Sequence, residues 1–132
     1  MAAAESYPED LRYHPEHDWV RIDGDEATFG VTWFAQEALG ELVHFEAPEE
    51  GSTVTKDQSY AEVESVKAVS DVIAPLSGDV LEVNSAVANA PETVNEDPYG
   101  DGWLVRVRLS DPGQVDALMD VEAYKQHVAE QG

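Results

Sequence analysis

Residues 60–75 read Tyr60-Ala61-Glu62-Val63-Glu64-Ser65-Val66-Lys67-Ala68-Val69-Ser70-Asp71-Val72-Ile73-Ala74-Pro75, and this stretch decides the fold. Apolar residues alternate with glutamates over residues 61–64, which is the pattern of a half-buried strand. The Val- and Ile-rich run over residues 69–73 predicts a partner strand. Lys67 therefore lies at the turn of a predicted hairpin that spans about residues 60–75.

A lysine at the tip of a rigid hairpin is a suitable attachment point for a prosthetic group. Its amine can be acylated, its stem is flexible, and the strands fix its place. The alternative is an ordinary solvated lysine, which describes most lysines in proteins. The rest of the chain favours the attachment point.

An internal repeat lies on either side of the hairpin turn. Gly40-Glu41-Leu42-Val43-His44-Phe45-Glu46 recurs as Gly78-Asp79-Val80-Leu81-Glu82-Val83-Asn84. Each copy is followed by a Pro-containing loop and a further predicted strand, over residues 60–66 and 103–109. Two such halves packed face to face predict a mainly β fold, a flattened β-barrel or sandwich with the hairpin exposed at one end.

Short peripheral helices are expected at two places. One is a helix that Thr32 caps and Gly40 ends, because Thr and Gly are preferred at those positions. The other is the C-terminal segment of about residues 112–130, which opens at Asp111 and shows helical spacing of apolar residues. Asp120 is the expected break between two helices there. The stretch from Pro91 to Gly102 is the longest predicted loop.

The domain organisation follows from length and composition. The 132 residues contain no Cys and predict a single domain over residues 11–132 after a flexible N-terminal segment of residues 1–10. The N-terminus lacks the pattern of a signal or transit peptide, and no apolar run is long enough for a membrane helix. We therefore expect a cytoplasmic protein with no membrane partner.

The net charge of −21, from 28 acidic against 7 basic residues, is the second constraint. It argues against nucleic acid as a partner. It also favours a soluble monomer and is compatible with a high-salt environment. Because the chain has no Cys, any sulfur chemistry must come from a cofactor.

The run Glu64-Ser65-Val66-Lys67-Ala68-Val69-Ser70-Asp71 resembles the lipoyl-lysine signature of the glycine cleavage system H protein family. Further blocks resemble that family in the same order, so the resemblance runs from about Leu11 to the end of the chain. These blocks are Leu11-Arg12-Tyr13, His17-Asp18-Trp19-Val20, Gly30-Val31-Thr32, Phe34-Ala35-Gln36, Leu39-Gly40 and Val94-Asn95-Glu96-Asp97-Pro98-Tyr99-Gly100-Asp101-Gly102-Trp103-Leu104.

The resemblance implies a lipoyl-carrier domain of the barrel-sandwich hybrid type, with lipoic acid in amide linkage on Lys67. It implies three enzyme partners: glycine decarboxylase (P protein), which uses pyridoxal phosphate, a tetrahydrofolate-dependent aminomethyltransferase (T protein) and dihydrolipoyl dehydrogenase (L protein). The carrier shuttles an aminomethyl group among them and has no catalytic residues. A lipoate ligase or octanoyltransferase would recognise the flanking residues, namely Glu64, Ser65, Val66, Ala68 and Asp71.

The resemblance also suggests where the loaded arm folds back. An aminomethyl thioether needs shelter from water, and the arm reaches somewhat over roughly 10 Å. Asp18, where the family commonly has Glu, is the first candidate for its ammonium, and Glu37 is the second. Trp33 stands where the family usually has an acid, and we expect it to pack structurally. His44, in a usually apolar place, is expected to be structural too.

Alternatives from other classes stay open at this point. His14 and His17 with nearby acids do not supply a third convergent metal ligand, so no metal site is predicted. Biotinyl carriers use a similar hairpin lysine, but they typically place Met where this chain has Val66 and Ala68. A lipoyl carrier that relays lipoate to other complexes or serves a sulfur pathway, and an unmodified paralogue, are the closer alternatives.

Overall fold

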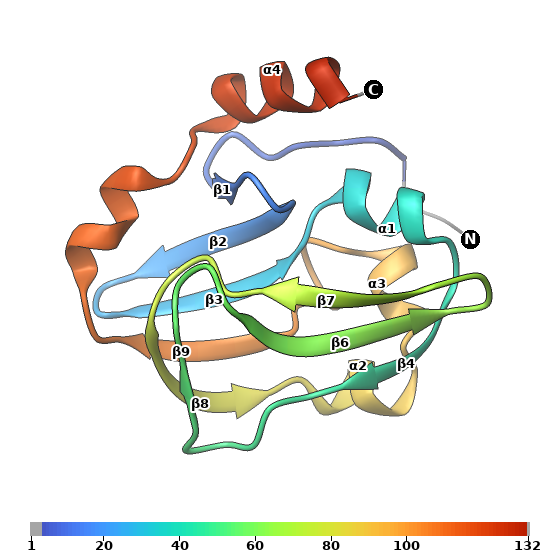
Figure 1. The fold of residues 1–132 in the computed structure, drawn as a ribbon, viewed down its shortest axis with the longest axis horizontal. Coiled ribbons are helices and arrows are strands. Elements are labelled where there is room, and N and C mark those ends of the chain that lie inside the picture. The colour runs from blue at the N-terminus through green and yellow to red at the C-terminus, as the bar shows by residue number, and fades with distance from the viewer. Residues whose placement is uncertain (1–3, 132) are drawn as a thin grey trace.

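The described residues, 4–131 of this computed structural model, form two antiparallel sheets with short helices around them (Figure 1). The larger sheet has the order β1-β2-β3-β9-β8-β5, and the smaller has the order β4-β6-β7. The strands are β1 Arg12–His14, β2 Asp18–Asp23, β3 Glu26–Val31, β4 Leu42–Glu46, β5 Thr53–Val54, β6 Ser59–Ser65, β7 Val69–Ile73, β8 Gly78–Val83 and β9 Val105–Leu109. The sheets do not close into a full barrel, and the prediction of a mainly β flattened barrel-sandwich is confirmed.

The main core lies between the two sheets, and side-chain alternation explains how it forms. In β6, Ala61, Val63 and Ser65 are buried while Glu62 and Glu64 are exposed, as a half-buried strand requires. Facing side chains come from the larger sheet, among them Val20, Phe29 and Val107. Full burial of a Val or Phe side chain contributes about 1.5–3 kcal/mol, so this layer holds the sheets together.

The two sequence repeats occupy equivalent places, one in each sheet. The first copy contains β4, which pairs with β6, and the second contains β8, which pairs with β9. The β4–β6 register is irregular between Leu42 and His44, and the β8–β9 register is irregular between Val80 and Glu82. Val43 and Leu81 are therefore extra residues that have no partner in the neighbouring strand. They hold matching positions in the two copies, so the two halves share this irregularity of strand pairing as well as the sequence pattern.

The predicted helix caps are present. Helix α1, Trp33–Leu39, begins where the Thr32 side chain accepts a hydrogen bond from Ala35 N and ends at Gly40, whose φ is 85°. The Asp111 side chain caps a 3-10 helix, η1 Pro112–Ala117, by accepting from Gly113 N. Asp120 accepts from Ala123 N at the start of α4, Val121–Gln131. The C-terminal segment is thus two short helices with the break at Asp120, although the first is not an α-helix.

The prediction of a long loop over residues 91–102 is wrong in part. This stretch contains α3, Thr93–Glu96, and a further helix that we did not predict, α2 Ser85–Asn89, precedes it. The Asn84 side chain caps α2 by accepting from Ala86 N. Both helices are too short to show a hydrophobic period, so their sequences do not distinguish them from loop.

The N-terminal segment makes contacts within its described part, from residue 4 onward. Tyr99 Oη donates to Ser6 O at 2.7 Å, and Tyr13 Oη donates to Pro8 O at 2.7 Å. Residues 1–3 lie outside the described residues, so flexibility of the whole segment stays a prediction. None of the helices within residues 4–131 is long and apolar enough to span a membrane.

Candidate functional site

Lys67 lies in the turn between β6 and β7, where the sequence predicts it, and the turn projects beyond the sheets (Figure 1). Buried Ser65 fixes this turn. Its backbone N donates to Ala68 O at 2.8 Å, and its Oγ accepts from Lys67 N at 3.3 Å and from Ala68 N at 3.1 Å. The backbone that carries the lysine is therefore held by several bonds while its neighbour Val66 is 77% exposed.

The lysine stem lies beside a groove of about 500 Å³ at the end of α1. The groove is lined by Gln36, Glu37, Gly40, Glu41, Lys67, Glu92, Asn95 and Glu96. None of the ion pairs in the described part of the chain involves Lys67, although four carboxylates line the same groove. The amine is thus exposed and is not tied to a carboxylate.

Two buried amides, Gln36 and Asn95, line this groove, and we predicted no role for either from the sequence. Asn95 Nδ2 donates to Gln36 Oε1 at 3.0 Å and to Gly40 O at 2.9 Å, while Asn95 Oδ1 accepts from Leu42 N at 2.9 Å. One side chain of α3 thereby ties the end of α1 to the start of β4. These contacts join residues more than 50 positions apart, so no local pattern indicates them.

Asp18, the first candidate for the loaded arm, is at the start of β2 and is 1% exposed. It lines a small cavity of about 50 Å³ together with Glu16, Val31, Ala35, Leu39, Val63, Ser70, Asp71 and Val72. Its Oδ2 has no hydrogen-bond partner among residues 4–131. Burial raises the pKa of Asp18 well above its usual value, and the charge of Glu16 adds to this.

Asp18 and Glu37, the two residues predicted to contact the loaded arm, lie in different sites, and the predicted hairpin residues do not all share one surface. Glu37 is exposed in the groove beside Lys67, not in the cavity of Asp18. Asp71, which we expected to serve ligase recognition, lines the Asp18 cavity. Glu64, Val66 and Ala68 are exposed on the hairpin, as surface recognition requires, whereas Ser65 is buried and supports the turn.

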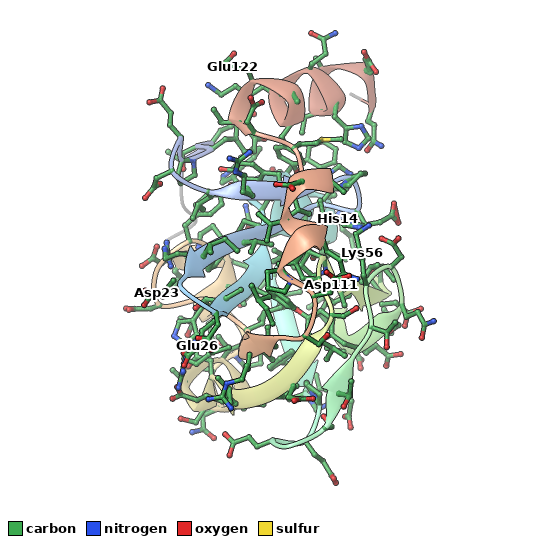
Figure 2. The ribbon with its side chains drawn as sticks, turned by 90° about the vertical axis from the view of Figure 1, so that its left-hand side faces the viewer. His14, Asp23, Glu26, Lys56, Asp111 and Glu122 are labelled. Carbon is green, nitrogen blue, oxygen red and sulfur yellow. The ribbon has the colours of Figure 1, made fainter. Side chains whose placement is uncertain are left out.

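His14, His17 and His44 have separate partners. His14 Nε2 lies 2.7 Å from Asp57 Oδ1, beside a depression that Lys56 also lines (Figure 2). His17 lies 2.8 Å from Tyr124 Oη and 2.7 Å from Gln131 Oε1, and burial lowers its pKa. Exposed His44 pairs with Glu46 at 3.0 Å. The described residues contain no cluster of three or more His, Cys, Asp or Glu side chains suited to a metal ion.

Trp33 packs against a second, aromatic cluster that lies under α4. The cluster comprises Leu11, Tyr13, Trp19, Tyr99, Val121 and Tyr124, with Trp33 half-buried at its edge. The backbone N of Trp33 donates to Tyr99 Oη at 2.8 Å. These contacts agree with the structural role that we expected for Trp33.

Comparisons with known proteins agree with this geometry. The family model described as "Glycine cleavage H-protein" matches residues 11–131. The "Glycine cleavage system H protein" of Anaeromyxobacter sp. (strain K) is 52% identical over 124 residues, which is 94% of this chain and 97% of the relative. The protein of the same name from Halorhodospira halophila (strain DSM 244 / SL1) is 51% identical over 126 residues, which is 95% of this chain and 97% of that relative.

A solved structure has the same fold. The crystal structure of a glycine cleavage system H protein from Mycobacterium marinum matches with a TM-score of 0.86 at 41% identity, and it covers 93% of this chain and 99% of that one. Family model, relatives and structure therefore agree over nearly the whole length of the chain. This chain belongs to the glycine cleavage H-protein family.

Proposed function

We propose that this chain is the lipoyl carrier of a glycine cleavage system and that lipoic acid is attached as an amide to Lys67 Nζ. The observation that carries the proposal is the position of Lys67, an exposed amine free of ion pairs on a turn that Ser65 fixes. Such an amine can be acylated without breaking any contact of the fold. When bound, lipoate supplies the sulfur that a chain without Cys lacks.

We assign the Asp18 cavity to the aminomethyl end of the loaded arm. Ser70 and Asp71, which line the cavity, lie on β7 three and four positions after Lys67, so the cavity is close in the chain to the attachment point. The cavity is acidic at Glu16, Asp18 and Asp71, polar at Ser70 and apolar at its other five lining residues. A small ammonium matches this lining, because a carboxylate accepts its hydrogen bonds and the apolar walls exclude water.

The partners follow from the carrier role. We propose that glycine decarboxylase loads the arm, that the aminomethyltransferase unloads it, and that dihydrolipoyl dehydrogenase reoxidises it. The chain itself would act as a monomer and catalyse none of these steps. A lipoate ligase or octanoyltransferase would modify Lys67 by reading the exposed residues of the hairpin. Cytoplasmic localisation stays a prediction from the sequence.

Modification of the chain tests the attachment site directly. Co-expression with a lipoate ligase should add one lipoyl- or octanoyl-sized mass, and Lys67→Arg should abolish the addition. Lys56 and Lys125 are the internal controls, because neither lies on the hairpin turn. Modification at Lys56 or Lys125, or an unmodified wild-type chain beside an active ligase, would contradict the proposal.

Reconstitution tests the carrier role. The lipoylated chain should support glycine-dependent reduction of NAD with the three partner enzymes, whereas the Lys67→Arg chain should not. Nothing in the described residues favours a biotinyl carrier or a lipoate relay. A chain that accepts lipoate but fails to support glycine cleavage would favour the relay.

A further inference from the structure

Asp18 is a buried acid without a compensating charge. The nine residues that line its cavity include no Lys, Arg or His. Its two acidic neighbours there, Glu16 on the β1–β2 turn and Asp71 on β7, add negative charge instead. An ionised carboxylate in such a place is so unfavourable that the group takes up a proton instead.

The other groups that face Asp18 cannot supply a positive charge. Tyr60 Oη on β6 is buried and also has no hydrogen-bond partner among residues 4–131, and burial and the charge of Asp18 raise the Tyr60 pKa. Burial likewise raises the pKa of Tyr124 on α4. His17 is next in the chain, but its ring bonds to Tyr124 and Gln131 and its pKa is lowered. A tyrosine has no cationic form, and burial disfavours the cationic form of His17.

The size and lining of the cavity define what could enter it. About 50 Å³ is room for a small group such as an aminomethyl ammonium. Asp18 lines this cavity, and its Oδ2 is buried without a hydrogen-bond partner among residues 4–131. A guest that only donates hydrogen bonds and carries positive charge would satisfy that oxygen.

We propose that Asp18 holds a proton while the cavity is empty and gives it up when the ammonium of a loaded arm enters. This inference rests on the proposed carrier function. The carboxyl O–H bond breaks, the proton leaves to solvent, and an N–H of the ammonium donates to Oδ2. If the amine arrives unprotonated, the same proton passes to its nitrogen. Asp18 adds no net charge to the cavity in either state, because it is a neutral acid before entry and half of an ion pair after it.

The exchange explains how an acidic cavity remains stable when empty. A permanently ionised Asp18 would attract any small cation from solution and would destabilise the fold whenever the arm is absent. A neutral Asp18 avoids both effects, and ionisation happens only when the tethered ammonium compensates it. Asp18 is thus a positioning group that changes its charge with the loading state of the arm.

Carbon-13 NMR of chains labelled at the Asp carboxyl carbon tests the exchange. Asp18 is identified by the signal that Asp18→Asn removes, and exposed Asp71 is the matched control in the same cavity. At pH 7 the empty, unmodified chain should give a protonated signal for Asp18, distinct from the signal of exposed Asp71. After loading by glycine decarboxylase, with the mass confirmed, the protonated Asp18 signal should be lost.

The outcomes separate this inference from the proposed function. An ionised Asp18 in the empty chain at pH 7 overturns the inference, whether or not Lys67 accepts lipoate. A protonated Asp18 in both the empty and the loaded chain overturns it as well. If Lys67 cannot be loaded, the proposed function fails, and methylammonium on the unmodified chain becomes the probe. Loss of the protonated signal at saturating methylammonium then supports the exchange, and its persistence overturns it.

Discussion

A Cβ atom on Gly40 would lie 3.4 Å from Cε of Lys67, so the stem of the lysine rests against the residue that ends α1. The contact joins the hairpin turn to the helix across the groove. Gly40 also has a φ of 85° and a ψ of −165°, a backbone conformation that is essentially restricted to glycine.

Gly40→Ala should therefore have two effects. The backbone strain should lower the free energy of unfolding by about 1–3 kcal/mol, and the new methyl group should slow lipoylation by restricting the lysine stem. Gly51→Ala is the control, because Gly51 has a φ of 88° and nothing within 4 Å of its ideal Cβ. Urea unfolding measures the change in stability, and a ligase time course measures the rate of lipoylation. Equal lipoylation rates in the two variants would disprove a role for the contact.

Asn95→Ala should destabilise the groove. It would leave Leu42 N–H, Gly40 C=O and Gln36 Oε1 without their partner, and each buried unsatisfied group costs about 1–3 kcal/mol. We expect a loss of at least about 2 kcal/mol in urea unfolding. Exposed Asn89→Ala, on α2, should stay within about 0.5 kcal/mol of the wild type. A similar loss of unfolding free energy in both variants would contradict the role of Asn95 in holding α1 to β4.

Asp18→Asn should shorten the lifetime of the isolated loaded carrier while leaving lipoylation of Lys67 unchanged. A hydrogen bond to a charged group contributes about 1.5–3 kcal/mol, so release of ammonia and formaldehyde should be roughly ten- to hundred-fold faster. Glu37→Gln, in the separate groove, should leave the lifetime nearly unchanged. Equal decay of wild type and Asp18→Asn, at low and at high salt, would mean that the arm is sheltered elsewhere.

The pH dependence of stability should reveal the buried acid in the empty chain. Because the pKa of folded Asp18 lies well above 3.8, the folded state binds more protons than the unfolded state above that pH. The contribution of Asp18 to stability is therefore fully present below pH 3.8 and declines as pH rises, by about 1.4 kcal/mol per pH unit, until the folded pKa is passed. Asp18→Asn should remove this decline in urea unfolding.

Asp57 is the control, because its contribution to stability should change with pH in the opposite direction. Its hydrogen bond with His14 lowers the pKa of the carboxyl, so its contribution is present above 3.8 and is lost as pH falls. Asp57→Asn should therefore remove stability at neutral pH and change little in acid. A wild-type curve that Asp18→Asn leaves unaltered in shape would show that Asp18 is ionised after all.

Tyr124→Phe should loosen α4. Its hydroxyl lies 2.7 Å from Thr32 Oγ1 and 2.8 Å from His17 Nδ1, and the residue is fully buried. Removing it should cost about 1–3 kcal/mol in urea unfolding, because buried partners lose their hydrogen bond. Tyr7→Phe is the matched control, since its hydroxyl makes an exposed bond to Glu5 and should cost little. Equal losses of unfolding free energy in the two variants would show that the buried hydroxyl of Tyr124 stabilises the fold no more than the hydroxyl of Tyr7.

The sequence predicts the hairpin, the repeat and the caps because each depends on local patterns. Alternation over residues 61–64 gives the strand face, and Thr32, Gly40 and Asp111 act on backbone groups close to them in the chain. The matching irregularities at Val43 and Leu81 lie within the repeat, although the repeat does not by itself indicate extra residues.

The site is less predictable because it depends on contacts between distant segments. Asn95 reaches Gln36 across 59 positions, and the Asp18 cavity needs β2, β3, α1, β6 and β7 together. The resemblance pointed to Asp18, but its complete burial and its separation from Glu37 follow from the packing of both sheets. We did not predict helices α2 and α3, because segments of four or five residues are too short to show a hydrophobic periodicity.

Trp19 gives this carrier a built-in optical reporter. Trp19 follows Asp18 in the chain. Its indole is fully buried, packs against Gly30 and donates from Nε1 to Pro98 O at 2.8 Å. Trp33 and Trp103, the other two emitters, are only half-buried, so replacing both with Phe would leave one fluorophore in the aromatic cluster under α4. Emission from that residue would follow the packing of this cluster and of α4 during unfolding, without any attached dye.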